Sequence, residues 1–405
     1  MTAPAPIVDL TDVEAFAAGA HREMFRWLRA TDPVHAHVFP DGGRFWALTR
    51  YRDVVAAYTD HRTFSSSGGA MLGGSFRSRE DTAAGRMLVA SDPPRHRLLR
   101  KVMHHAFSPE RIRLVQRQVE LLVDAAVDRL LADGGGDFAT DVAPELPAGA
   151  LMAMVGLSQD EAHELIGMTR RMIGFRDPVL VEQTSDVRLQ LAGIQADIFD
   201  FFEEVIRLRR HRPGDDLVSL LLTATINGRP LPEEEVLYNC MNVAVGGNET
   251  SSYTACSGLL ALLDHPDQSS ILLRDPELLD CAIGEMLRWS STNAYVQRVA
   301  VRDTEIGGRH IRSGDSVTLW NVSANFDEDQ FDEPNVFRVT RTPNRHLTYG
   351  VGIHRCIGAT LAHVELGTLF ARILPHLPRM QQAGEARRLR SNFILGTTSM
   401  PIVMI

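Results

Sequence analysis

A single cysteine near the C-terminal end of the sequence lies in a glycine-rich run that could hold it as a thiolate. The run reads Tyr349-Gly350-Val351-Gly352-Ile353-His354-Arg355-Cys356-Ile357-Gly358, and we expect a helix to begin directly after it. The free N–H groups and partial positive charge of a helix N-terminus stabilise sulfur as an anion. Gly350, Gly352 and Gly358 allow a positive φ and let the backbone lie close to a flat ligand. A lone thiolate of this kind suits one axial bond to haem iron, whereas the ordinary alternative is a buried free cysteine.

A second run with chemical potential lies inside a segment that we predict as one long helix, from about residue 232 to 263. It reads Val245-Gly246-Gly247-Asn248-Glu249-Thr250. Two glycines in mid-helix cost roughly 1 kcal/mol each against alanine, so a compensating role is expected. Either a flat ligand needs the space of the missing side chains, or Thr250 bonds to a backbone carbonyl and opens a groove. The remaining alternative is close packing of a second helix on the glycines.

The cysteine run resembles the haem-binding loop of the cytochrome P450 family. It matches the pattern aromatic-Gly-x-Gly-x-His-x-Cys-x-Gly and continues with Leu361-Ala362 and Glu365. The resemblance covers essentially the whole chain from Trp46 onward, and it implies heme b (iron-protoporphyrin IX) with Cys356 as the metal ligand. One residue departs from the pattern, because the family usually has phenylalanine where this chain has Tyr349. This exchange keeps the ring and adds a hydroxyl that needs a partner.

The helical run resembles the family's oxygen-activation motif, small-Gly-x-acid-Thr. The resemblance implies that Thr250 holds dioxygen and a water molecule, and that Glu249 relays protons from solvent. Splitting the O–O bond consumes two protons, and a site that did not control their delivery would release peroxide. Gly246, where many members have alanine, stays within the family's range and is expected to lie against the cofactor.

Haem carries two propionates that need cationic partners. His96 and Arg100 lie one turn apart on the same face of a helix that we expect to begin near residue 92. Together with Arg298 and His354 they resemble the family's propionate clamp, and arginine can grip a carboxylate with two hydrogen bonds. Considered alone, His96 would be an ordinary surface histidine.

Glu285 and Arg288 stand three positions apart on one face of a predicted helix. Such pairs are common on solvated helices, but here the pair resembles the family's Glu-x-x-Arg signature. The resemblance implies that Glu285 and Arg288 buttress the core behind the haem, with Arg341 as a third member. We expect these residues to act in folding and not in catalysis.

The composition of the 405-residue chain, 44% hydrophobic and 23% charged, is typical of a folded protein with a large core. No stretch approaches the roughly 18–20 apolar residues of a membrane span, and no signal peptide opens the sequence, so we expect a soluble, cytoplasmic protein. Four cysteines without a CxxC pair argue against a disulfide framework and a zinc site. The net charge of −9 disfavours nucleic acid as a partner.

The expected fold is mainly α with small β-sheets, in agreement with the cytochrome P450 fold that the resemblance implies. No linker or repeat divides the chain, so we expect residues 1–405 to form a single domain, with residues 1–20 as a loose N-terminal arm. Ser108 is predicted to cap a helix that ends before Gly134. The other predicted elements are strands at 45–49, 299–306 and 316–322 and helices from residue 275 and from Cys356 to about residue 375.

The function that these residues favour is that of a haem-thiolate monooxygenase. A thiolate ligand favours O–O cleavage and an oxidant that can attack unactivated carbon. Because the chain carries no flavin or iron–sulfur module, we expect it to take electrons from a separate ferredoxin and ferredoxin reductase. We also expect the protein to be a monomer. Two alternatives remain open. A peroxide-driven or isomerising haem-thiolate enzyme would not need the pair Glu249-Thr250, and a non-catalytic haem sensor would carry an output domain.

The substrate pocket is expected between the segments 64–87, 242–246, 293–296 and 395–398. This lining is more polar than that of a hydrocarbon pocket, which favours a substrate with an amide, amine or carboxyl-derived group. The sequence most resembles soluble bacterial members that tailor natural products in secondary metabolism, some of which oxidise aminoacyl groups tethered to carrier proteins. The residues predicted to touch the substrate are Asn242, Val245, Ala294, Val296 and Thr397.

Overall fold

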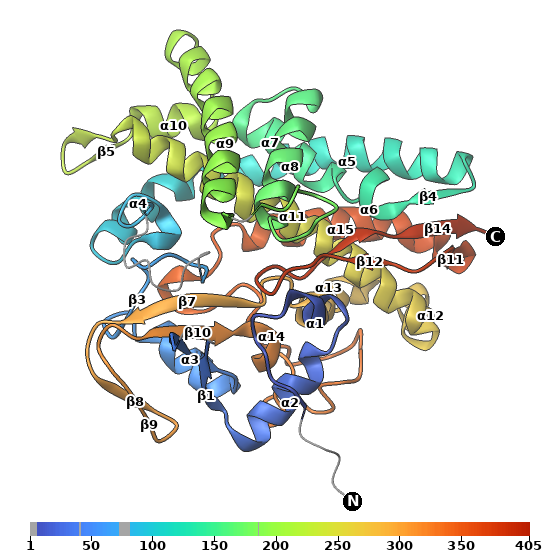
Figure 1. Cartoon of the computed structure of the whole chain (residues 1–405). Helices are drawn as coiled ribbons and strands as arrows, with labels where there is room; N and C mark the ends of the chain where they lie inside the picture. The colour runs from blue at the N-terminus through green and yellow to red at the C-terminus, as the bar shows by residue number, and fades with distance from the viewer. Residues whose placement is uncertain (1–5, 40–41, 73–81, 185) are drawn as a thin grey trace, which may run out of the picture.

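The computed structural model describes residues 6–39, 42–72, 82–184 and 186–405, and its secondary structure is mainly helical with small sheets, as predicted (Figure 1). The α-helices are α1 (Val13–Ala17), α2 (His21–Thr31), α3 (Tyr51–Thr59), α4 (Arg95–Met103), α5 (Pro109–Ala132), α6 (Phe138–Asp141), α7 (Glu145–Val155), α8 (Gln159–Ile173), α9 (Val187–His211), α10 (Leu217–Thr223), α11 (Glu233–Asp264), α12 (Pro266–Arg274), α13 (Leu279–Ser290), α14 (Asn321–Ala324) and α15 (Ala359–Ile373).

The strands are short and form five small sheets within the described ranges. They are β1 (Val34–Val38), β2 (Arg44–Leu48), β3 (Phe64–Ser65), β4 (Gly135–Asp137), β5 (Thr225–Ile226), β6 (Arg229–Pro230), β7 (Tyr295–Ala300), β8 (Thr304–Ile306), β9 (Arg309–Ile311), β10 (Ser316–Trp320), β11 (Met380–Gln382), β12 (Arg387–Arg388), β13 (Thr397–Ser399) and β14 (Pro401–Met404). The largest sheet has the order β1-β2-β10-β7-β3, in which β2 and β10 are parallel and the other pairs antiparallel.

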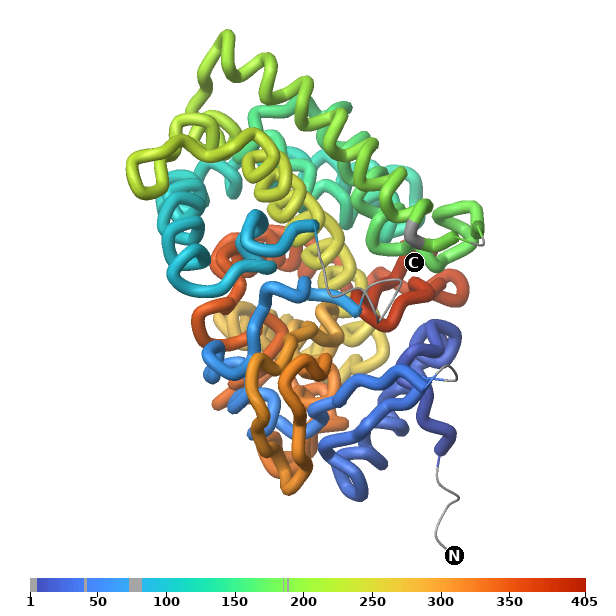
Figure 2. The backbone as a smooth tube through the Cα atoms, turned by 60° about the vertical axis from the view of Figure 1, so that its left-hand side comes forward, coloured from blue at the N-terminus to red at the C-terminus, as the bar shows by residue number. Residues whose placement is uncertain are grey.

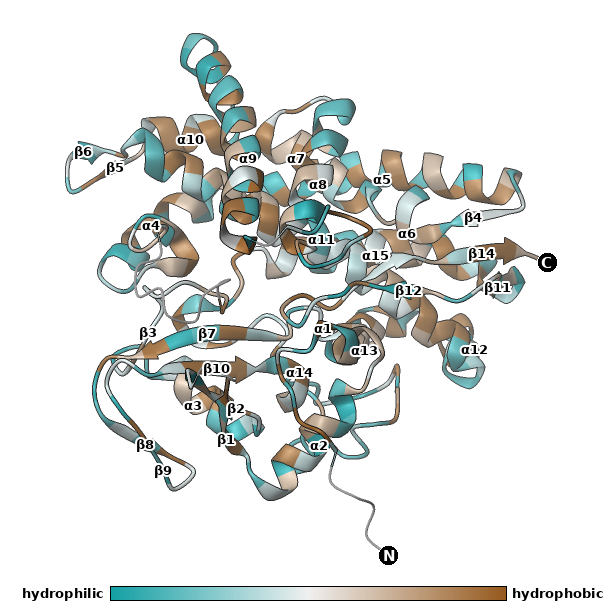
Figure 3. Cartoon of the chain, in the orientation of Figure 1, coloured by the Kyte–Doolittle hydropathy of each residue, from teal (hydrophilic) through white to brown (hydrophobic). Residues whose placement is uncertain are grey.

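Helix α11 crosses the interior of the molecule (Figure 2, yellow) and packs against α7, α8, α13 and α15. Three glutamates, Glu233 to Glu235, open its first turn, where negative charge complements the helix dipole. The helix ends at Asp264 because Pro266, two residues on, cannot continue it. The helices around it bury one face each, and Figure 3 shows hydrophobic and hydrophilic residues interspersed along α5 and α9.

Several predicted elements are confirmed with shifted ends. Ser108 caps α5 by accepting a hydrogen bond from the Arg111 N–H at 3.4 Å. The strand predicted at 299–306 begins earlier, at Tyr295, and is broken between β7 and β8. The strand predicted at 316–322 ends at Trp320, because the next four residues turn into α14. The helix predicted from residue 275 starts with a 3₁₀ turn, and its α-helical part begins at Leu279.

The predicted loose arm over residues 1–20 is wrong for the part that follows Leu10. Leu10 and Phe16 are fully buried in a cluster with Phe25 and Trp320, so this segment is packed onto the β-rich part of the molecule. Asp12 caps α1 through the Glu14 and Ala15 N–H groups. Residues 1–5 lie outside the described ranges.

The predicted contact between Glu285, Arg288 and Arg341 is confirmed. Arg288 grips the Glu285 carboxylate with two hydrogen bonds of 2.7 and 2.8 Å, and Arg341 Nε lies 3.0 Å from Glu285 Oε2. All three side chains are buried, and both guanidinium groups also donate to backbone carbonyls. Removing one member would leave buried charge unpaired, which is strongly destabilising.

Within the described ranges, none of the helices combines the length and the apolar character that crossing a bilayer requires.

Candidate active site

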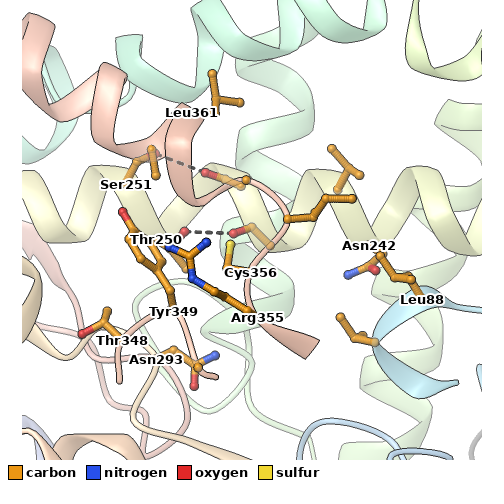
Figure 4. A pocket seen from close by; sticks show the side chains of 18 of the residues that line it. Leu88, Asn242, Thr250, Ser251, Asn293, Thr348, Tyr349, Arg355, Cys356 and Leu361 are labelled. Carbon is orange, nitrogen blue, oxygen red and sulfur yellow. Dashed lines mark hydrogen bonds between the residues drawn. The ribbon is translucent and has the colours of Figure 1, made fainter. Parts of the chain in front are cut away.

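A large cavity lies between α11 and the glycine-rich loop that carries Cys356 (Figure 4). Its empty volume is about 1660 Å³, which includes some space open to solvent. Residues from α4, α7, α11, β7 and α15 contribute to its walls. All nine residues predicted to bind the cofactor line this cavity: His96, Arg100, Gly246, Arg298, Tyr349, Gly350, His354, Cys356 and Gly358.

The loop before α15 holds Cys356 in a tight backbone turn. The Cys356 N–H donates to the Tyr349 carbonyl oxygen at 2.8 Å, which closes the loop. Gly350 and Gly352 have φ of 62° and 79°, a region that favours glycine, as predicted. A Cβ at Gly352 would also lie 2.9 Å from the Tyr58 carbonyl oxygen. Gly358 has φ of −89°, so the prediction of a positive φ is wrong there; a Cβ would instead stand 4.0 Å from Cys356 Sγ.

The free thiol of Cys356 does not have the lowered pKa that its position before a helix suggested. Burial raises its pKa, while the Gly358 N–H, Arg100 and Arg355 act in the opposite direction. A metal ion would reverse this balance, because a coordinating thiol loses its proton outright. The N–H group and the two arginines would then stabilise the anion.

One edge of the cavity is lined by four cationic or basic side chains, His96, Arg100, Arg298 and His354. The rings of His96 and His354 lie 4.1 Å apart, and Ser66 Oγ lies 3.0 Å from His354 Nε2. Burial lowers the pKa of His96 to about 4 and that of His354 to about 2, with nearby arginines adding to each shift. Both ring nitrogens of His96 are buried without a hydrogen-bond partner in the described part of the chain. This edge is therefore built to receive an anionic group.

The Tyr349 hydroxyl is also buried without a partner among the described residues. Burial raises its pKa, and the neighbouring Cys356 and Glu365 add to the shift, so the group stays a neutral donor. An unpaired buried hydroxyl is costly, which points to a partner that occupies the cavity.

Helix α11 presents a bare backbone to the cavity at Gly246 and Gly247. Nothing lies within 4 Å of a Cβ built at either residue, so close helix packing is excluded as the reason for the two glycines. The Thr250 hydroxyl donates to the Gly246 carbonyl oxygen at 2.9 Å and lines the cavity. Both predicted consequences are present: space for a flat ligand, and a side chain that competes for the helix carbonyls.

Glu249 points away from the cavity, toward α8. Its carboxylate is fully buried, and Oε2 lies 3.2 Å from Arg170 Nε. Burial raises the pKa of Glu249, while Arg170 and the Tyr253 hydroxyl lower it. Arg170 keeps 18% of its side chain exposed, so it joins the buried acid to the molecular surface.

The cavity wall beside α11 is mostly apolar with a few amide groups. Asn242 and Val296 line it as predicted, with Leu88 and Met154 as apolar neighbours. The Asn242 amide makes no hydrogen bond within the described chain and faces the cavity (Figure 4). The predicted segment 64–87 lies partly outside the described ranges, in residues 73–81.

Three predicted substrate contacts are not part of the cavity wall: Val245, Ala294 and Thr397. Val245 packs on the opposite side of α11, in a cluster with Tyr253 and Ile394. Ala294 is fully buried, and its N–H donates to the Phe393 carbonyl oxygen. Thr397 is buried in strand β13. Val245 and Ala294 lie in predicted segments that border the cavity, but their side chains face protein. The predicted segment 395–398 contributes no residue to the cavity wall.

The residues present fit a haem group. The Cys356 sulfur faces a cavity with glycines on both sides, at Gly350 and Gly246, and a basic edge suits two carboxylates. The basic edge also includes contributions that the sequence did not reveal. Tyr58 lines the cavity from α3, and Ser66 Oγ lies 3.0 Å from His354 Nε2. The Asp92 carboxylate in turn accepts the Ser66 N–H at 2.9 Å. Arg170 gave no sequence signal either.

Comparison with known proteins identifies the family to which most of the chain is similar. The sequence profile of the family described as Cytochrome P450 matches residues 38–274 and 269–388. Linalool 8-monooxygenase of Pseudomonas putida is 32% identical over 98% of each chain.

Solved structures agree in fold. A Mycobacterium marinum cytochrome P450 in complex with pseudoionone superposes with a TM-score of 0.89 at 32% identity, covering 100% of both chains. P450 OxyD, which is involved in the biosynthesis of vancomycin-type antibiotics, gives a TM-score of 0.86 at 31% identity over 98% of this chain and 99% of that chain. The predicted architecture is therefore confirmed.

Proposed function

This chain belongs to the cytochrome P450 family and is a monooxygenase, and from that premise we propose that it binds heme b through Cys356 and is reduced by a separate ferredoxin. One observation carries the proposal. The lone cysteine of the loop, the four basic side chains and Thr250 all face one cavity with a bare glycine backbone above it. A haem ligated by a thiolate supplies an oxidant that can attack unactivated C–H bonds.

We assign the proton supply to Thr250 and Glu249. The Thr250 hydroxyl faces the cavity and can hold a water molecule there, while Glu249 on the other side of α11 contacts the partly exposed Arg170. If the Glu249 carboxylate moved from Arg170 to the Thr250 side of α11, it would carry protons toward the cavity in a controlled way. A peroxide-driven or isomerising enzyme has no use for this pair, which supports the monooxygenase over those alternatives.

We propose that the substrate is a small, uncharged molecule with one polar group. The charged side chains of the cavity wall belong to the basic edge, to the cysteine loop or to α15, and the wall beside Asn242 carries none among the described residues. An ionised substrate would therefore be buried without a counter-charge. The relatives include a monooxygenase named for linalool and a P450 that is involved in antibiotic biosynthesis. Both a terpenoid alcohol and an amide of secondary metabolism, free or tethered to a carrier protein, meet this description.

Replacing Asn242 with leucine is expected to weaken binding of the natural substrate by about tenfold or more. The unpartnered amide can pair with the substrate's polar group, and leaving that group unpaired costs roughly 1–3 kcal/mol. Titration followed by the haem spin-state change measures the dissociation constant. Each polar ligand should be compared with its hydrocarbon analogue. An equal affinity of both variants for the polar ligand would contradict this role of Asn242.

The electron donor is expected to dock on exposed cations of α4, the first turns of α5 and the cysteine loop. From the sequence we expect five cations near this surface: Arg97, Lys101, Arg111, Arg113 and Arg355. Four of them are exposed and form no ion pair with other described residues, whereas Arg111 is engaged by Asp215. Acidic ferredoxins would be attracted to such a patch, and salt would screen the attraction over a Debye length of about 8–10 Å.

The experiment that tests the proposed function is turnover of the haem-loaded enzyme with NAD(P)H, ferredoxin and ferredoxin reductase. Reversing Arg97 and Lys101 to glutamate should raise the apparent KM for ferredoxin by about tenfold at low salt, because steering is lost. Arg274→Glu is the control, since α12 lies on the other side of the molecule from α4 (Figure 1). Turnover supported equally well by peroxide alone would overturn the proposed function. A KM for ferredoxin that depends on neither salt nor these charges would contradict the proposed docking surface.

A further inference from the structure

A tyrosine one helical turn beyond Glu249 stands on the same face of α11. Residues four apart on a helix are neighbours, so the Tyr253 side chain lies beside the Glu249 carboxylate. The Tyr253 ring is fully buried in a small cluster with Ile173, Leu389 and Ile394. This cluster lies on the side of the helix that faces away from the cavity.

The backbone of the C-terminal segment fixes the position of this ring. A Cβ built at Gly396 would stand 2.3 Å from a carbon of the Tyr253 ring, so only glycine leaves room for it. The Gly396 carbonyl oxygen accepts a hydrogen bond from the Leu389 N–H at 2.9 Å, and the Leu395 N–H donates to the Thr292 carbonyl oxygen at 2.7 Å. The segment that holds the ring is therefore itself anchored.

Two buried polar atoms remain without an aligned partner in the described chain at this point. They are Glu249 Oε1 and the Tyr253 hydroxyl oxygen, while the other carboxylate oxygen is engaged by Arg170. The two groups lie one helical turn apart on α11, and in that arrangement the Tyr253 hydroxyl lowers the pKa of Glu249 while Glu249 helps to raise the pKa of Tyr253. These directions make tyrosine the donor and the carboxylate the acceptor.

We infer that Tyr253 is a positioning residue for Glu249, whose carboxylate it holds, together with Arg170, in a resting orientation turned away from the cavity. A phenylalanine would fill the same volume, so packing alone does not account for a buried hydroxyl at this position. The carboxylate is then released toward Thr250 only when it leaves both donors. The inference rests on the proposed function only for the direction in which protons move. The contact between Tyr253 and Glu249 does not depend on the proposed function.

The surroundings of Glu249 contain few other groups that change charge. Arg170 faces it from α8, and Tyr253 and Cys256 face it from α11. Burial raises the pKa of the Cys256 thiol, which stays neutral, and the pKa of Arg170 is also raised. A titration in this cluster above the usual carboxyl range therefore belongs to Glu249.

Tyr253→Phe in the haem-loaded enzyme tests the inference. Because the hydroxyl lowers the pKa of Glu249, its removal should move the carboxyl titration upward by about one pH unit. The titration is measured by the carboxyl stretching band in infrared difference spectra, and the loss of the band in Glu249→Gln assigns it. The acidic limb of the pH profile for coupled product formation should move in the same direction, while substrate affinity stays within twofold.

Tyr295→Phe is the matched control, since it removes another fully buried hydroxyl, one that accepts the Leu72 N–H at 3.2 Å. It should leave the Glu249 band unmoved. Gly396→Ala, which displaces the ring and keeps the hydroxyl, should shift the band as Tyr253→Phe does. An unmoved band in Tyr253→Phe overturns the inference whatever the turnover. A moved band with an unmoved turnover profile upholds the contact and removes Glu249 from the proposed relay instead.

Discussion

The Cys356→Ser variant is expected to lose the spectroscopic signature of thiolate ligation and nearly all monooxygenase activity. Serine fits the same loop, because the turn depends on the Cys356 N–H bond to the Tyr349 carbonyl and on Gly350 and Gly352. Its hydroxyl, however, does not ionise at neutral pH and cannot donate electron density to iron as sulfur does. The measurement is the Soret band of the reduced, carbonmonoxy-bound protein, which is shifted to the red by a thiolate.

Cys281→Ser serves as the matched control for this variant. Cys281 is partly exposed, donates its thiol hydrogen to the Arg341 carbonyl oxygen and is not part of the cavity wall. It should leave the Soret band and the haem content unchanged. An unchanged carbonmonoxy spectrum in Cys356→Ser would remove the foundation of the proposed function, since no other cysteine faces the cavity among the described residues.

Thr250→Ala is expected to divert most reducing equivalents from product to peroxide while haem and substrate binding persist. The variant removes the hydroxyl that donates to the Gly246 carbonyl oxygen and faces the cavity, together with the side-chain methyl group. Without this hydroxyl, water in the cavity would lose a fixed partner and proton delivery would be uncontrolled. Glu249→Gln is expected to slow coupled product formation by about 10²-fold, because an amide cannot carry a proton. It should also lower thermal stability, since Arg170 loses its buried counter-charge.

Both variants are measured by comparing NAD(P)H consumed, peroxide released and product formed. Ser257→Ala is the control, because it removes a small hydroxyl from the same helix outside the cavity wall. Substrate titration by the spin-state change should give the wild-type affinity for all three. Fully coupled turnover at the wild-type rate in Thr250→Ala and Glu249→Gln would contradict the roles assigned to them.

Local sequence determined the parts of this protein that depend on neighbours a few positions away. Glycines at positions 350 and 352 predicted a turn that places Cys356 before a helix, and Ser108 predicted a helix start. The pair Glu285 and Arg288 follows from helical spacing. In each case the interacting groups are within about one turn of the chain, so propensity, capping and turn geometry suffice to bring them together.

Tertiary packing decided which side chains meet across long stretches of sequence. Arg170 reaches Glu249 over 79 residues, and Ser66 reaches His354 over 288 residues, with no local pattern to announce either contact. Packing also turned Val245 and Ala294 away from the cavity, although their segments border it, and it placed Thr397 in a strand that does not reach the cavity wall. The physical reason is that a sequence pattern specifies a segment's secondary structure, whereas the direction of one side chain depends on the helices and strands that cover it.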